Sequence, residues 1–517
     1  MTRARGERRL SGDAAADIEV VAKGGATQIV GQVTQRSLSF FFTFVAARVL
    51  GPAAYGLYRQ ISQVLAVAGQ LGLAGFNYAS MRFISLARAK GDPGGVRGAA
   101  RVGLSSAAIL SLIVCGVLVV AAEPLGRLFV ESEEDVAEFA TLLRIGAAYV
   151  PLFALMQVLR YCTQAYKTMV PSVVVGNIIQ PLARFVLGVA LLLAGFAVAG
   201  AVTSLVVSIV VAVVLGAWYF NRMLTPEERA APARARPAAM IRFALPQGGS
   251  SILGVQNLGL GILILGMASS NRAVGLFAIA LALQGPGTVF LGGIVNIWAP
   301  VVSELHSLGQ IERLDSLYKT INRWIATFSF PVFGALMLEP DLFAWFVGGD
   351  KGIDAGPAVA ILAVGNIFYT GTGPTGYVIS MTGHPAVNFV NSVVAVALYA
   401  GLGFAIVPEY GVVGMAVVDS LVTALVNIAR VVEAKLLVGV QPFGRSFLKP
   451  VVATLVGAAV LLLWRLVPAE GRFIEIIGIV VAAAAYLGAL AALGIDPEER
   501  HVFDRIKKRI FARRIGR

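Results

Sequence analysis

The sequence predicts an all-α polytopic membrane protein with about 14 transmembrane helices, because apolar stretches of about twenty residues recur along it. Of its 517 residues, 57% are hydrophobic and only 14% are charged, and the mean hydropathy is +0.79. A soluble domain carries nearer a quarter charged residues. The stretches do not alternate as the strands of a membrane barrel do. Helices are therefore the spanning elements, since lipid offers no partners for exposed peptide groups.

The apolar stretches fix where the expected spans lie. We place them near 24–50, 55–81, 102–122, 136–160, 171–194, 197–219, 243–267, 274–300, 323–346, 356–381, 385–407, 411–436, 447–465 and 473–493. The connection 220–242 places three prolines among arginines, which is typical of a mobile linker between two halves. The expected organisation is a tail (1–23), a first lobe (24–219), the linker (220–242), a second lobe (243–436), two more spans (437–493) and a basic tail (494–517).

Charge predicts the orientation. With the N-terminus in the cytoplasm, most of the 42 Lys and Arg fall in cytoplasmic tails and loops, whereas outer loops carry acids such as Glu133, Glu134 and Asp135. This bias is the one that orients membrane proteins, so we expect both termini in the cytoplasm. The basic tail would keep the chain on that face or bind anionic lipid headgroups.

Composition also argues against several classes of partner. A net charge of +13 would suit nucleic acid, but aromatic residues are not interleaved with the charge, so we expect no nucleic-acid partner. Cys115 and Cys162 lie in or at the end of predicted spans, and the three histidines are scattered. We therefore expect no disulfide, metal or cofactor. The first twenty residues lack the apolar core of a removable signal peptide.

The two halves repeat. The matched pairs at one offset are Pro171 with Pro385, Asn177 with Asn391 and Gly200 with Gly414, and at a slightly larger offset Tyr55-Gly56-Leu57-Tyr58 matches Val274-Gly275-Leu276-Phe277. An even number of spans per half predicts two parallel six-helix repeats, related by an axis along the membrane normal, with substrate bound between them.

Five basic residues lie within predicted helices: Arg36, Arg48, Arg59, Arg144 and Arg184. Arg48 and Arg59 are near helix ends and can extend to the interface. Arg36 and Arg184 are near the middle of the membrane, where an arginine costs about 2.5–3.5 kcal/mol even on mild scales. Such a residue requires a water-filled cavity, a partner or a ligand.

Arg36 belongs to a polar stripe along the first span, made of Gln28, Gln32, Gln35, Arg36, Ser39 and Thr43. Their spacings of three and four residues put them on one helix face. That face either lines an internal aqueous space or forms a polar seam between helices. In the second half Val255 stands where Arg36 would be, so the first half supplies the positive charge.

No catalytic constellation emerges. There is no Ser/His/Asp grouping, and no glycine-rich phosphate loop followed by Lys-Ser or Lys-Thr. We expect a transporter and not an enzyme. The alternative of another class is a polymerase of envelope polysaccharide assembly, which would need a larger outer loop than this chain offers.

The end of the first span reads Ala47-Arg48-Val49-Leu50-Gly51-Pro52-Ala53-Ala54-Tyr55-Gly56-Leu57-Tyr58. It resembles the signature of the polysaccharide-transport flippases, in the multidrug/oligosaccharidyl-lipid/polysaccharide exporter superfamily. That resemblance implies two six-helix bundles around a V-shaped cavity, to which lipid II flippases add two C-terminal helices. It also implies transfer of an undecaprenyl-diphosphate-linked oligosaccharide from the inner to the outer leaflet of the cytoplasmic membrane by alternating access. Alternatives within the superfamily are a lipid II flippase and a multidrug exporter, and a polysaccharide polymerase is an expected partner.

On this resemblance, guanidinium groups would hold the substrate, because they form paired, charge-assisted hydrogen bonds with phosphate oxygens. Arg36 and Arg184 would bind the diphosphate, while the remaining substrate-binding residues would be Arg59, Arg144, Gln28 and Gln32. The alternative for Arg184 is pairing with a carbonyl group or a neighbouring helix.

Energy and motion give the last expectations. Asp419 is the only carboxylate placed deep in a span, so it would bind the coupling proton or sodium, or else form a fixed pair with a basic residue such as Arg184. The runs around Pro286 and around Gly373 and Pro374 are expected to break or kink helices. They would serve as hinges or, alternatively, as close packing sites.

Overall fold

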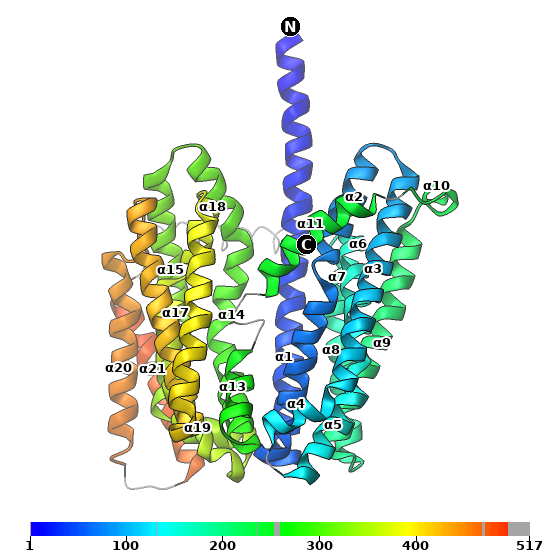
Figure 1. Cartoon of the computed structure of the whole chain (residues 1–517). Helices are drawn as coiled ribbons and strands as arrows, with labels where there is room; N and C mark the ends of the chain where they lie inside the picture. The colour runs from blue at the N-terminus through cyan, green and yellow to red at the C-terminus, as the bar shows by residue number, and fades with distance from the viewer. Residues whose placement is uncertain (1, 131, 235, 253–258, 468–470, 495–517) are drawn as a thin grey trace, which may run out of the picture. The chain divides into compact units, whose positions relative to one another are not determined.

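The computed structural model describes residues 2–130, 132–234, 236–252, 259–467 and 471–494, and this part of the chain consists of helices joined by turns, with no β-strand (Figure 1). Of these helices, 11 are long and apolar enough to cross a membrane. The all-α polytopic membrane fold is therefore confirmed. Val255 and the basic tail beyond residue 494 lie outside the described residues.

The chain forms two compact units. Unit 1 comprises Met1–Gly285, Ala344–Ala358 and Phe389–Val422, and unit 2 comprises Pro286–Phe343, Val359–Asn388 and Thr423–Arg517. Several helices of the second half of the sequence therefore contribute to both units.

The first helix of unit 1, α1 (Thr2–Leu73), consists of two arms that meet at Gly51, whose φ of 73° is one that L side chains rarely adopt. The arms run back along each other (Figure 1). The Phe42 ring meets the Tyr58 ring edge-on at 5.8 Å, and the Tyr55 hydroxyl donates to Thr43 Oγ1 at 3.2 Å. These contacts join residues more than ten positions apart, which a straight helix would hold far from each other.

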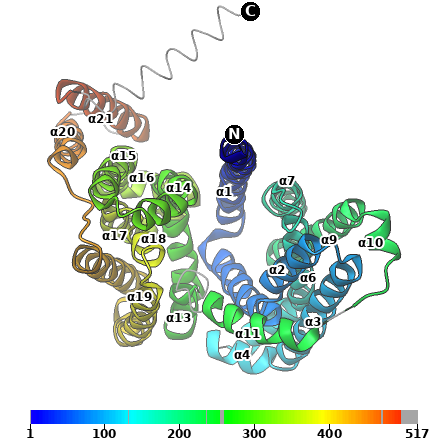
Figure 2. The ribbon, with the colours of Figure 1, turned by 90° about the horizontal axis from the view of Figure 1, so that it is seen from above.

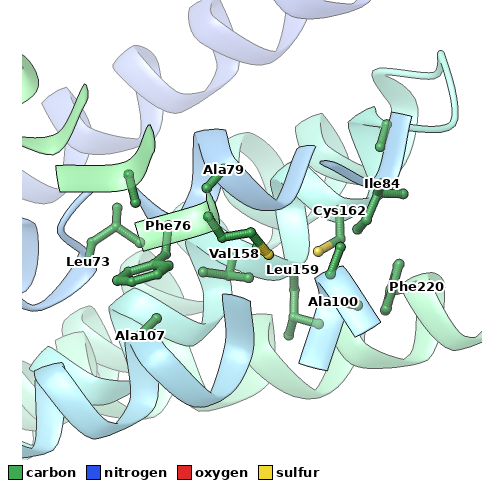
Figure 3. Close-up of a cluster of buried hydrophobic side chains, with 14 of the residues drawn as sticks. Leu73, Phe76, Ala79, Ile84, Ala100, Ala107, Val158, Leu159, Cys162 and Phe220 are labelled. Carbon is green, nitrogen blue, oxygen red and sulfur yellow. The ribbon is translucent and has the colours of Figure 1, made fainter. Parts of the chain in front are cut away.

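The rest of the first half continues the bundle of unit 1. Its helices are α2 (Phe76–Ala89), α3 (Pro93–Val120), α4 (Ala122–Phe129), α5 (Glu133–Ala147), α6 (Tyr149–Gln164), α7 (Val170–Val173), the π-helix η1 (Val174–Ile179), α8 (Gln180–Leu193) and α9 (Ala197–Met223). Figure 3 shows the apolar core between α2, α3 and α6, where Phe76, Ala107, Val158 and Cys162 are buried. Small residues such as alanine let these helices approach closely, and close packing favours the association of helices in lipid.

The linker expected over 220–242 is held against unit 1. It forms α10 (Pro226–Ala230), whose first turn is closed by reciprocal hydrogen bonds between Thr225 and Glu228. Arg97 of α3 donates to the carbonyl oxygens of Arg229 and Ala231 at 2.6 and 3.0 Å. Side chains from the helices therefore satisfy backbone groups of residues 225–231, and the mobility of the linker stays a prediction.

Glu228 is the buried centre of this attachment. It is 6% exposed, accepts a hydrogen bond from the Tyr166 hydroxyl at 2.8 Å, and lies 3.5 Å from Arg88 Nε. Burial, together with the bond to Glu228, raises the pKa of the Tyr166 hydroxyl well above its ordinary value. Tyr166 therefore stays protonated and keeps donating to the carboxylate.

The second half contains α11 (Pro237–Ile252), α13 (Leu260–Ala268), α14 (Asn271–Ser307), α15 (Ile311–Leu338), α16 (Pro340–Gly348), the 3-10 turn η2 (Asp350–Ala355), α17 (Gly356–Thr372), α18 (Thr375–Met381), α19 (Pro385–Leu437), η3 (Arg445–Phe447), α20 (Leu448–Trp464) and α21 (Arg472–Ala492). Like α1, α19 holds two arms, which meet at Gly411 with φ 52°. These arms correspond to the spans expected over 385–407 and 411–436.

The two glycine–proline runs behave differently. Between α17 and α18 the helix breaks at Gly373, with φ 67°, and Pro374, as the run predicts. In contrast, α14 continues through Pro286 without a break, so a kink or close packing is left for this run, and its role as a hinge stays a prediction. Ser329 of α15 donates to the Gly287 carbonyl at 2.6 Å, which attaches α14 to α15 beside the proline. The boundary between the units nevertheless falls between Gly285 and Pro286.

The last two helices pack on α15 in unit 2. Figure 2 shows α20 and α21 beside α15, and the Tyr486 hydroxyl of α21 donates to the Thr327 carbonyl at 2.7 Å. At the end of α20, Arg465 Nε donates to Glu339 Oε1 at 3.1 Å. The two C-terminal helices are thus attached to the rest of unit 2 by defined hydrogen bonds.

Candidate functional site

A polar cavity of about 130 Å³ lies within unit 1, between the two arms of α1 and the start of α8. Its lining comprises Gln35, Leu38, Ser39, Phe42 and Thr43 from the first arm, Tyr55, Tyr58 and Arg59 from the second arm, and Gln180, Pro181 and Arg184 from α8. The cavity has room for several water molecules.

Two arginines in this lining have hydrogen-bonding capacity left over. Arg184 donates to the Tyr58 hydroxyl, and its guanidinium carbon lies 4.9 Å from the centre of the Phe42 ring. The Nε atoms of Arg59 and Arg184 are buried and have no hydrogen-bond partner among the described residues. Buried cations with unfilled donors are costly unless an anion or water completes them. The cavity can therefore accept an anion.

A third arginine, Arg160 of α6, connects with this cavity through an amide. Arg160 donates to Gln157 Oε1 at 2.9 Å, to Asn177 Oδ1 at 2.8 Å and to the Ser172 carbonyl at 3.0 Å. Asn177 in turn donates to Oε1 of Gln35, a lining residue, at 2.6 Å.

The same network reaches a second polar cavity of unit 1, of about 150 Å³. This cavity is lined by Gln70, Leu73, Gly75, Asn77, Tyr78, Gln157, Tyr161 and Gly248. Because Gln157 lines it and also accepts from Arg160, hydrogen-bonded side chains connect the two cavities. Unit 1 thus contains a continuous polar track with neutral amides on either side of Arg160.

The backbone around Asn177 is unusual. Asn177 lies in η1, a π-helical turn between α7 and α8, and such turns are frequent at functional sites. Gly176 precedes it, and a Cβ at that position would lie 2.2 Å from Arg160 Cζ. Glycine is required there because the guanidinium crosses directly over the backbone.

The structure brings together only part of the predicted substrate-binding set. Arg59 and Arg184 share the cavity, and Gln35, Ser39 and Thr43 of the polar stripe line it as well. Arg36 is exposed, and neither Arg36 nor Gln28 or Gln32 belongs to the lining. The roles assigned to these three residues remain predictions.

Arg144 is not brought to the cavity. It forms an ion pair with Glu123 of α4 at 2.8 Å, and both side chains are about half exposed. The hydrogen bond and the charge of Arg144 lower the pKa of the Glu123 carboxyl below its ordinary value. The guanidinium group of Arg144 is therefore paired with a carboxylate of the same unit.

Arg48 of the signature caps another helix. It donates to the Phe346 carbonyl at 2.9 Å and to the Trp345 carbonyl at 3.3 Å, both near the C-terminal end of α16. Its guanidinium also lies 4.7 Å from the Phe44 ring centre. The Trp345 carbonyl also accepts from the Gly349 N–H at 2.8 Å, and a cation beside these carbonyls complements the negative end of the helix dipole.

Gly56 of the signature lies at a close crossing of two helices within unit 1. A Cβ on Gly56 would lie 1.8 Å from the Asn271 carbonyl oxygen, and a Cβ on Gly275 would lie 1.8 Å from the Pro52 carbonyl oxygen. Gly56 and Gly275 are the pair matched between the halves of the sequence. The two contacts are reciprocal, because each glycine receives the carbonyl of a residue four positions before the other.

Asp419 does not pair with Arg184. The hydroxyl of Tyr399, on the opposite arm of α19, donates to the Asp419 carboxylate, while Arg184 bonds Tyr58. An ion pair between Asp419 and Arg184, the predicted alternative, is absent from the described residues. Coupling by Asp419 stays a prediction.

Sequence reasoning missed Arg160 because it stands at the expected end of a span, where a basic residue is unremarkable. A signal was present: Gln157, Arg160 and Gln164 recur at spacings that share one helix face. Arg430 was missed although it falls inside an expected span.

The comparisons with known proteins agree with this architecture. A family model described as "Polysaccharide biosynthesis protein" matches residues 21–306. The fold is similar to that of the lipid II flippase MurJ in an inward closed conformation, at 12% identity and a TM-score of 0.71, over 90% of this chain and 98% of that one. It is also similar to an inward-facing multidrug resistance MATE family transporter of the MOP superfamily, at 16% identity and a TM-score of 0.64, over 78% of this chain and 94% of that one. No curated protein sequence matches. Likenesses at such identities show a shared fold.

Proposed function

This chain belongs to the polysaccharide biosynthesis protein family, and from that premise we propose that it is a flippase for undecaprenyl-diphosphate-linked oligosaccharide. It would move this lipid from the inner to the outer leaflet of the cytoplasmic membrane by alternating access, with both termini in the cytoplasm. The observation that carries the proposal is the cavity of unit 1, where Arg59 and Arg184 offer unfilled guanidinium donors.

A diphosphate would supply the negatively charged hydrogen-bond acceptors that the guanidinium groups of this cavity lack. Its oxygens accept several hydrogen bonds at once, and guanidinium groups match phosphate geometry. A charged head cannot cross the hydrocarbon unaided, because an unpaired buried charge is very costly. Arg59 and Arg184 would replace water around the diphosphate during the crossing, while the lipid chain stays in the bilayer.

The polar track supports movement of the head in steps. Gln157, Arg160, Asn177 and Gln35 connect the two cavities of unit 1. Amides can donate or accept, so they can exchange partners with sugar hydroxyls as the head moves. Arg160 would provide the intermediate positive charge.

Two alternatives within the superfamily differ in support. A lipid II flippase also carries a diphosphate-linked sugar, and the two additional helices α20 and α21, together with the coverage of MurJ, favour it as the second candidate. An exporter of cationic drugs is disfavoured, because the cavity of unit 1 is lined by two cations and by no carboxylate. A polysaccharide polymerase would act on the product in the outer leaflet.

The test is a leaflet assay in a deletion strain complemented with variants. The wild type should restore outward transfer of lipid-linked oligosaccharide, and Arg59→Gln and Arg184→Gln should each reduce it at least about tenfold, since one charge-assisted hydrogen bond contributes about 1.5–3 kcal/mol. Arg127→Gln, which removes an exposed arginine of the same unit, is the matched control. Normal outward transfer in the deletion strain would refute the proposal, and preferential transfer of lipid II would favour the second candidate.

A further inference from the structure

Unit 2 contains a cavity that the diphosphate site does not use. Its volume is about 360 Å³, within the range of about 300–1,000 Å³ that is typical of small-molecule sites. The lining comprises Leu291, Val295, Tyr369, Gly373, Pro374, Gly376, Tyr377, Ser380, Met381, Asn388, Asn427 and Arg430. It lies where the break at Gly373 and Pro374 separates α17 from α18.

Arg430 of α19 gives this cavity its charge. Its Nε atom is buried and has no hydrogen-bond partner among the described residues. The titratable groups that interact with its charge are Tyr369 and Glu433, and Glu433 does not belong to the lining. The described lining therefore holds one cation and no carboxylate, which favours an anionic group inside the cavity.

The remaining polar groups are amides and hydroxyls. Asn427 Nδ2 donates to the Thr423 carbonyl at 2.8 Å, and Asn388 Nδ2 donates to Ser380 Oγ at 3.2 Å. These bonds orient the two amides, which can each form further bonds. Tyr369 and Tyr377 add aromatic rings to the lining. Oriented amides bond ring hydroxyls, and aromatic rings cover the apolar face of a sugar.

We propose that this cavity binds one acidic sugar ring of the transported glycan. Arg430 would pair with the carboxylate of the ring, Asn388 and Asn427 would bond its hydroxyls, and Tyr377 would cover one face. The inference rests on the proposed function for the identity of the substrate, and it adds a preference for a sugar that carries a carboxylate. The diphosphate site in unit 1 and the sugar site in unit 2 would then recognise separate parts of one substrate.

The experiment measures binding of two small probes to the full-length protein in phosphatidylcholine nanodiscs by saturation-transfer NMR. Methyl β-glucuronide and methyl β-glucoside differ only at C6, which is a carboxylate in the first and a hydroxymethyl group in the second. We expect the wild type to bind the glucuronide at least tenfold more tightly. Arg430→Gln should abolish this preference, and Arg430→Lys should retain part of it. Arg313→Gln, which removes an exposed arginine on α15, is the matched control and should leave it unchanged.

Separate probes distinguish this proposal from the proposed function. Pyrophosphate binding should be lost in Arg184→Gln and retained in Arg430→Gln, whereas glucuronide binding should show the opposite pattern. Equal binding of the two sugars by the wild type would overturn the proposal without any variant. Displacement of the glucuronide by phosphatidylglycerol in the disc would also overturn it, because the occupant would then be a lipid headgroup. A failed leaflet assay alongside intact glucuronide binding would count against the flippase and not against this site.

Discussion

Replacing Gly56 with alanine tests the close crossing within unit 1. The added Cβ would lie 1.8 Å from the Asn271 carbonyl oxygen and 2.8 Å from the Gly275 nitrogen. Both neighbours are backbone atoms, so no side chain can rotate away. The helices must separate by more than about 1 Å, and overpacking of this kind costs typically about 1–3 kcal/mol. Alanine recovers about 0.5–1 kcal/mol of helix propensity. We expect a net loss of about 1.4 kcal/mol, or roughly tenfold in the folding equilibrium.

The assay is reversible unfolding in mixed micelles, with Gly116→Ala as the matched control. Gly116 lies in α3, and a Cβ there would meet nothing within 4 Å, so this variant should be neutral or slightly stabilised. The variants Gly56→Ala and Gly275→Ala should not be additive, because one separation of the helices relieves both clashes. Equal stability of Gly56→Ala and Gly116→Ala would refute the close crossing, and strict additivity would refute its reciprocal character.

Three further predictions concern the track, the coupling site and the linker. Gly176→Ala should displace the Arg160 guanidinium, because the added Cβ would lie 2.2 Å from Arg160 Cζ. We expect transport to fall at least about tenfold without loss of membrane insertion. Full transport in this variant would exclude a role for the polar track. Asp419→Asn should abolish any response of vesicle transport to an imposed proton or sodium gradient, and a wild type that ignores both gradients would end the coupling hypothesis. Glu228→Gln should weaken the bonds to Tyr166 and Arg88, so limited proteolysis should cut residues 225–231 faster than in the wild type; an unchanged rate would show that Arg97 alone holds the linker.

Hydropathy predicted most of the spanning elements, because the bilayer imposes a length and a composition on every helix. The two arms of α1 and of α19 follow from the apolar stretches on either side of Gly51 and Gly411. Arg59 and Arg184 were recognisable as candidates because a charge within an apolar stretch is conspicuous.

The features that were missed depend on tertiary contacts. Arg160 is connected with the first cavity through Asn177, which lies 17 positions further along the sequence in a π-helical turn that no local pattern predicted. The linker was predicted to be mobile because prolines and arginines are typical of loops, and its hydrogen bonds with Arg97 and Tyr166 join residues that are far apart in the sequence.

The partners of the arginines differ between the ends of helices and the interior of unit 1. At helix ends, Arg144 and Arg465 are paired with Glu123 and Glu339. These pairs neutralise their charge and leave nothing for a ligand. Inside unit 1, Arg184 donates a hydrogen bond to a tyrosine hydroxyl.

Arg160 likewise donates hydrogen bonds to two side-chain amides and a backbone carbonyl group. Neutral partners replace part of the lost hydration without cancelling the charge, so the cation remains costly until an anion arrives. A carboxylate partner would stabilise the protein without substrate and would compete with a diphosphate for the guanidinium group. The choice of neutral partners therefore favours the loaded state over the empty one, which is what a carrier of an anionic lipid head requires. Placing an acid beside Arg184, as in Tyr58→Glu, should consequently weaken pyrophosphate binding more than Tyr58→Phe does. An equal loss of binding in the two variants would show that the tyrosine hydroxyl itself matters for binding, and not the absence of a competing negative charge.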